Sequence, residues 1–96
     1  MSELMQKCVG VVDGGMLLMD NDEMLVLARV RVPRLGLPGG AVLRMLLQRE
    51  AQDQAIRVEP VGRDGYGNVV AEAWANGRNL NDYMRERIRD RGYDAD

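Results

Sequence analysis

Apolar residues in the first third of the chain form short runs that are separated by glycine-rich and acidic turns. Residues 8–12 form one run, residues 16–19 a second, and residues 24–32 a third, which stops at Pro33. An Asp-Gly-Gly sequence joins the first two runs and four polar residues join the last two, and both connections are typical of hairpins. The pattern predicts three antiparallel strands in a meander.

The spacing of apolar residues changes in the second half of the chain. Residues 41–52 have apolar positions three and four apart, which indicates a helix, whereas residues 55–61 and 69–74 read as strands. Asn79 or Asn81 is placed to cap a last helix. The order is βββ-α-ββ-α, which predicts a mainly β fold with two helices, the layout of an OB-fold barrel. Other small α+β folds share this order.

Ninety-six residues, of which 46% are hydrophobic and 29% charged, are typical of one globular domain. We expect the domain to cover residues 8–92, with an N-terminal extension at residues 1–7 and a frayed tail at residues 93–96. No apolar run approaches the roughly 20 residues of a membrane span. The N-terminal residues also lack the pattern of a secretion signal, so we expect a cytoplasmic protein without membrane partners.

Candidate chemistry is limited by composition. The chain has no histidine, and Cys8 is its one cysteine, which excludes an internal disulfide, the usual zinc and haem sites and His-dependent nucleophiles. We therefore expect no cofactor and no metal. The net charge of −2 argues against nucleic-acid binding through bulk charge, yet all basic residues except Lys7 are arginines. One explanation is genomic, because GC-rich genomes favour arginine codons. The alternative is that a local cluster of these arginines forms an anion site.

Four stretches in order are similar to the staphylococcal nuclease (thermonuclease) family. Residues 11–14 carry the Asp-Gly of its first hairpin. Residues 27–33 resemble its third strand, which also has a proline where Pro33 stands. Residues 62–71 resemble its Asp-x-Tyr-Gly loop and the apolar strand that follows, and residues 76–81 resemble its turn into a helix. The resemblance implies an OB-fold barrel and an ancestral calcium-dependent nuclease.

The same resemblance implies that the catalytic chemistry is lost. Gly15 and Arg31 stand where the family has metal-binding aspartates, and Arg34 stands where it has the glutamate that assists water. Val26 and Asn68 replace its two phosphate-clamping arginines. The resemblance therefore implies a pseudo-nuclease, whose remaining Asp13 is explained as a turn residue.

Arginines nevertheless gather at the former site. On a strand that runs to residue 32, Arg29 and Arg31 share a face, and Arg34 follows directly after the strand. The same alternation places Leu25 and Leu27 on the arginine face. We hypothesise an anion-binding patch formed by Arg29, Arg31 and Arg34, against the alternative of an ordinary solvated strand face.

Two further features have a structural and a functional interpretation. Tyr66 is either an anchor of its loop or a stacking platform for a base. Arg85 and Arg89 lie one helical turn apart but alternate with acidic residues, which predicts a salt-bridged solvent face.

Three classes of function fit these observations. The first is a non-catalytic binding module for nucleic acid or another anionic partner, with a protein as the alternative partner. The second is a protein-interaction or structural subunit of a larger assembly, such as one from a phage or mobile element. The third is an active calcium-dependent nuclease with a rebuilt site.

Overall fold

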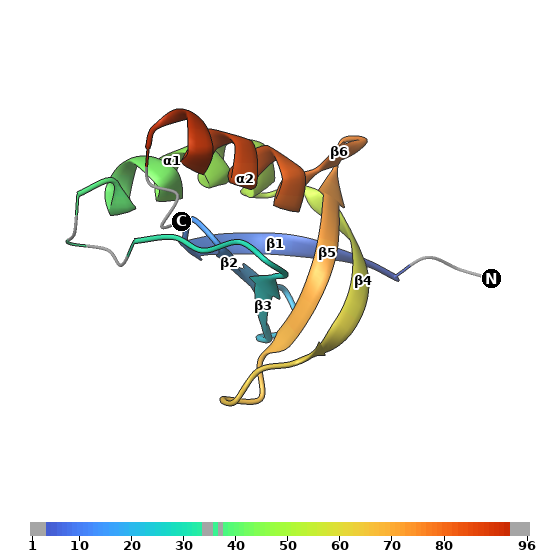
Figure 1. Cartoon of the computed structure of the whole chain (residues 1–96). Coiled ribbons are helices and arrows are strands. Elements are labelled where there is room, and N and C mark those ends of the chain that lie inside the picture. The colour runs from blue at the N-terminus through green and yellow to red at the C-terminus, as the bar shows by residue number, and fades with distance from the viewer. Residues whose placement is uncertain (1–3, 34–35, 37, 93–96) are drawn as a thin grey trace.

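A computed structural model describes residues 4–33, 36 and 38–92. Five of its strands form a closed, mixed β-barrel, and a short sixth strand extends it (Figure 1). The strands are β1 (Leu4–Asp13), β2 (Met16–Met19), β3 (Met24–Leu27), β4 (Ala55–Arg63), β5 (Val69–Ala75) and β6 (Arg78–Asn79). The order βββ-α-ββ-α predicted from the sequence is confirmed.

The barrel closes where β3 meets β5. All other neighbouring strands are antiparallel, but β3 and β5 run parallel, with Leu25 opposite Val69 and Leu27 opposite Ala71. The long β1 serves both sides of the barrel, since its second half pairs with β2 and its first half with β4. Closure leaves few unpaired strand edges.

Two helices, α1 (Gly40–Ala51) and α2 (Leu80–Asp90), lie side by side over one end of the barrel (Figure 1). Apolar residues at helical spacing turn toward the barrel in each, with Leu43 and Leu47 of α1 and Met84 and Ile88 of α2 buried. The opposite end of the barrel carries the β2–β3 turn and the β4–β5 loop (Figure 1). The site described below lies at the helical end.

Asn81 is the one buried polar side chain in the described core. Its Oδ1 accepts a hydrogen bond from the Ala73 amide, and its Nδ2 donates to the carbonyls of Ala28 and Ala71, each at 3.0 Å. All three bonds join the first turn of α2 to β5 and to the segment after β3. Asn79, by contrast, is the N-cap of α2 and accepts from the Asp82 amide at 2.7 Å, so the structure assigns the cap to one of the two predicted candidates.

Two predicted boundaries are wrong. Residues 4–7, which we had assigned to an N-terminal extension, form the first half of β1 because they pair with residues 55–58 of β4. The third strand ends at Leu27 instead of residue 32, because a turn follows in which Arg29 has a φ of 59°. The predicted tail at residues 93–96 lies outside the described residues.

The turn after β3 also changes which side chains face the core. Leu25 and Leu27 are buried, and Ala28 directly after them is buried too. Strict alternation therefore breaks between Leu27 and Ala28, and the two leucines do not share a solvent face with the arginines as predicted. The Ala28 amide donates to the Ala71 carbonyl at 2.9 Å, which keeps the chain beside β5 as it leaves the barrel.

Candidate anion-binding site

Arg29 is presented by the turn after β3 and not by a strand face. Its left-handed backbone directs the side chain out of the barrel, where Nη2 donates to Oε2 of Glu72 on β5 at 2.9 Å. The Arg29 side chain is 73% exposed, but that of Glu72 is only 15% exposed. The carboxylate is thus fixed against the barrel while the guanidinium remains accessible to a ligand.

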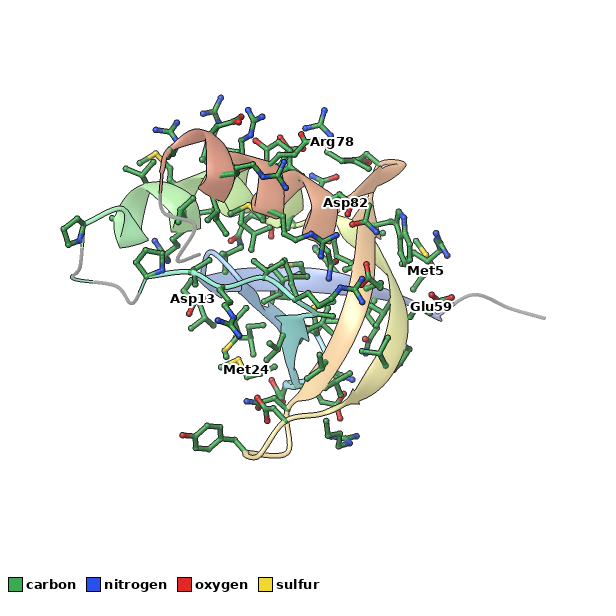
Figure 2. The ribbon with its side chains drawn as sticks, in the orientation of Figure 1. Met5, Asp13, Met24, Glu59, Arg78 and Asp82 are labelled. Carbon is green, nitrogen blue, oxygen red and sulfur yellow. The ribbon has the colours of Figure 1, made fainter. Side chains whose placement is uncertain are left out.

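Helix α2 supplies a second pair of arginines. Residues three and four apart share one side of a helix, so Arg85, Ile88 and Arg89 face the same way. Ile88 is buried and holds this side of α2 against the barrel. Arg85 forms an ion pair with Asp82, which stands at the start of the helix near the top of Figure 2.

The two pairs of arginines meet in one hollow. Arg29 and Arg31 line it from the segment after β3, Arg85 and Arg89 line it from α2, and Ile88 completes the set around a volume of about 370 Å³. We call this site the arginine hollow. Four guanidinium groups around one concavity form a site of strongly positive potential, although the whole chain has a net charge of −2.

Only part of this charge is neutralised. Glu72 pairs with Arg29 and Asp82 pairs with Arg85. Within the part of the chain that the structure describes, neither Arg31 nor Arg89 has a carboxylate within ion-pair distance. Among the described residues, Arg31 and Arg89 thus have no carboxylate partner. An anionic ligand can also displace Glu72 from Arg29 and Asp82 from Arg85. Guanidinium groups match phosphate well because two parallel N–H groups can bind two of its oxygens.

The structure brings together some of the predicted site residues and separates others. Arg29 and Arg31 line one hollow, and a turn rather than a shared strand face places them there. Arg34 lies outside the described residues. Tyr66 is at the tip of the β4–β5 loop, at the end of the barrel away from the helices, and is 93% exposed. It does not belong to the arginine hollow.

Sequence reasoning missed the contribution of α2. The i, i+4 spacing of Arg85 and Arg89 is a visible signal, but the acidic residues between them favoured a solvent face. The ion pair of Arg85 with Asp82 confirms part of that interpretation. The proximity to Arg29 and Arg31 depends on how α2 packs over the barrel, which no local pattern records.

Asp13 acts within its own turn. Its Oδ1 accepts a hydrogen bond from the Gly15 amide at 2.8 Å, which stabilises the β1–β2 connection. Among residues 4–33, 36 and 38–92, no three His, Cys, Asp or Glu side chains are grouped closely enough to hold a metal ion. The residues at the positions named by the nuclease resemblance, with Arg31 in place of a carboxylate, do not fit a calcium ion.

Asp64 organises the loop that carries Tyr66. Its Oδ1 accepts hydrogen bonds from the amides of Tyr66 and Asn68 at 2.9 Å, and its Oδ2 accepts from the Asn68 side chain at 3.2 Å. Burial acts to raise the pKa of the carboxyl, but the hydrogen bonds from Asn68, Tyr66 and Gly67 outweigh it, so that the pKa of Asp64 is lowered. The loop is thus held by Asp64 and not by Tyr66, whose exposed ring does not anchor it.

We expect Asp64→Asn to make stability less dependent on pH in the acid range. A carboxyl whose folded-state pKa is lowered stabilises the fold above its unfolded-state pKa, about 3.9, and this contribution is lost as the pH falls through the folded value. The stability difference between wild type and variant should therefore shrink below about pH 4. Urea unfolding from pH 7 to pH 2.5 measures it, with Asp20→Asn on the β2–β3 turn as control. A difference that stays constant over this range would contradict the assignment.

Cys8 is not part of a reactive site. Its side chain is buried, and its Sγ donates to the Gly10 carbonyl at 3.1 Å. Burial raises the pKa of the thiol, and the charge of Asp53 acts in the same direction. A buried thiol of this kind is a poor nucleophile.

Within the described residues, no helix has both the length and the apolar character required to cross a bilayer. No protein-family model matches the chain, and no curated protein is significantly similar to it.

Proposed function

We propose that this protein is a non-catalytic binding module that recognises a phosphate-bearing partner, in the first place single-stranded nucleic acid, through the arginine hollow. The supporting observation is the convergence of Arg29, Arg31, Arg85 and Arg89 on one concavity of a chain whose net charge is negative. The charge is concentrated where a ligand can reach it, so binding needs no excess of positive charge over the whole surface.

The resemblance to the nuclease family supports the same proposal. Residues that resemble its substrate cleft now carry arginines where the family has acids, which replaces metal-mediated contact with phosphate by direct contact. The single cysteine, which allows no internal disulfide, favours a reducing, cytoplasmic site of action.

The test replaces the two unpaired cations of the hollow. Arg31→Glu combined with Arg89→Glu should weaken binding of a labelled oligothymidylate at least tenfold. It should also flatten the salt dependence of the affinity, by about 1.4 in log–log slope if both arginines contact phosphates of a single strand. Fluorescence anisotropy between 50 and 200 mM salt gives both quantities.

A matched variant separates the hollow from bulk charge. Arg49→Glu with Arg91→Glu changes the net charge equally, at exposed positions near the ends of α1 and α2 that do not line the hollow. Equal weakening by both double variants would mean that binding is diffuse. Absence of binding by the wild type would reject nucleic acid as the ligand, and calcium-dependent cleavage of the probe that a chelator abolishes would reject the non-catalytic assignment.

A protein partner is the second candidate, and a separate surface favours it. On the outer face of the barrel, the Arg57 guanidinium lies 3.8 Å from the ring centre of Trp74, beside Met5, which is 53% exposed (Figure 2). Tryptophan, methionine and arginine are enriched at protein interfaces. A pull-down from the native host compares Trp74→Ala with the double variant Arg31→Glu and Arg89→Glu. The variant that loses the partner identifies which of the two surfaces binds it.

A further inference from the structure

A second hollow lies at the other end of the barrel. It has a volume of about 490 Å³ and is lined by residues of the β2–β3 turn and the β4–β5 hairpin. Both connections lie at the end of the barrel away from the helices (Figure 1). Its apolar wall consists of Met19, Met24, Leu25, Val58, Pro60 and Val69. We call this hollow the barrel mouth. Met24 marks its position in Figure 2.

The floor of the barrel mouth is the edge of the hydrophobic core. Met19, Leu25 and Val58 come from three different strands, and each is at most 5% exposed. They close the floor, and the half-buried Met24 and Val69 above it provide the apolar surface that a ligand can reach. The volume falls within the range of about 300–1,000 Å³ that is typical of small-molecule sites.

Polar groups surround this floor with an excess of negative charge. Glu23 lines the barrel mouth, Asp20 and Asp22 are exposed on the same turn, and Asp64 lies on the facing loop. The cation that lines the mouth is Arg63, whose Nη1 donates to the Gly67 carbonyl at 2.7 Å.

Lys7 is the other cation near this end, and strand geometry directs it elsewhere. Neighbouring residues of a strand point to opposite faces, and Gln6 lines the barrel mouth, so Lys7 projects from the outer face. Four carboxylates thus lie on the turn and loop around the barrel mouth against the guanidinium of Arg63, and of these carboxylates Glu23 lines the mouth itself. Arg63 already donates to the Gly67 carbonyl, so a ligand with an apolar body and a positive charge beside Glu23 matches this arrangement better than an anion does.

We propose that the barrel mouth binds a small organic cation, an amine whose apolar body rests on Met24 and Val69 and whose ammonium group lies beside Glu23. The site is independent of the arginine hollow, because the two share no residue and lie at opposite ends of the barrel. Binding at the barrel mouth therefore does not depend on binding at the arginine hollow.

The experiment compares two probes of equal carbon number whose head groups carry opposite charges. Octylammonium should shift the amide resonances of Met19, Leu25 and Val58 in a saturable manner, and octanoate should bind at least tenfold more weakly. Glu23→Gln, a change on an exposed turn, should reduce that preference severalfold. Equal binding of the two probes, or shifts that map outside the barrel mouth, would overturn the proposal.

A pair of phenylalanine variants tests the location. Val69→Phe fills the barrel mouth and should abolish binding of octylammonium, whereas Val61→Phe adds the same bulk at a position that is 59% exposed and outside the lining. Unchanged binding by folded Val69→Phe would contradict the site. Where Val69→Phe does not fold, the effect of Glu23→Gln on the preference between the probes decides.

Discussion

Replacing Asn81 by alanine should lower the free energy of unfolding by about 3–5 kcal/mol, because two buried backbone groups lose their partner at about 1–3 kcal/mol each. These groups are the Ala73 amide and the Ala28 carbonyl. The Ala71 carbonyl loses one bond but keeps the bond from the Ala28 amide. Urea denaturation measures the change.

Asn79→Ala is the matched control for this prediction. It removes the side-chain cap of the same helix at a partly exposed position, and loss of a cap typically costs about 1 kcal/mol. If Asn81→Ala destabilised the protein no more than Asn79→Ala, the buried amide would not be the connection between α2 and the barrel that the structure indicates.

Gly14→Ala should destabilise the protein by about 1–3 kcal/mol, as overpacking of a filled core does. A Cβ atom at Gly14 would lie 2.9 Å from the Leu43 Cβ, 3.0 Å from the Val32 Cγ1 and 3.3 Å from the Leu43 carbonyl carbon. The Leu43 Cβ and carbonyl carbon are held by the backbone of α1, so rotation of a side chain cannot relieve this contact. Thermal and urea unfolding both report the change.

The adjacent glycine provides the control. A Cβ at Gly15 would meet its nearest atoms, on Val30 and Asp13, at 3.6–3.8 Å, which is ordinary van der Waals contact. Gly15→Ala should therefore change stability by less than about 0.5 kcal/mol. Equal losses for the two variants would show that the turn, and not the packing of α1 on it, is what the substitutions disturb.

The sequence predicted the barrel because its signals are local. Turn residues and the change from twofold to helical spacing mark each element, and the number and order of the elements follow from them. The face of β3 was predicted wrongly because alternation was extended past its end. Val30 and Val32 pack against the core that contains Leu25 and Leu27, since the turn at Arg29 reverses the faces.

The candidate site was predicted in part for the same reason. Arg29 and Arg31 are neighbours in the chain, so their proximity is a local property. Their meeting with Arg85 and Arg89 depends on the packing of α2 over the barrel, where Asn81 joins the start of α2 to the segment after β3. Such a bridge joins residues 28 and 81 and has no signature in the spacing of either segment.

The parallel contact between β3 and β5 also has a consequence for how the chain folds. The β1–β2 and β2–β3 hairpins join near neighbours in sequence and can form early, whereas Leu25 and Val69 are separated in the chain by α1, β4 and the β4–β5 loop. Closing so long a loop loses chain entropy before any contact compensates for it. The amides of this seam should be the last to gain protection from hydrogen exchange during refolding, and the barrel should fold more slowly than a helical protein of equal length.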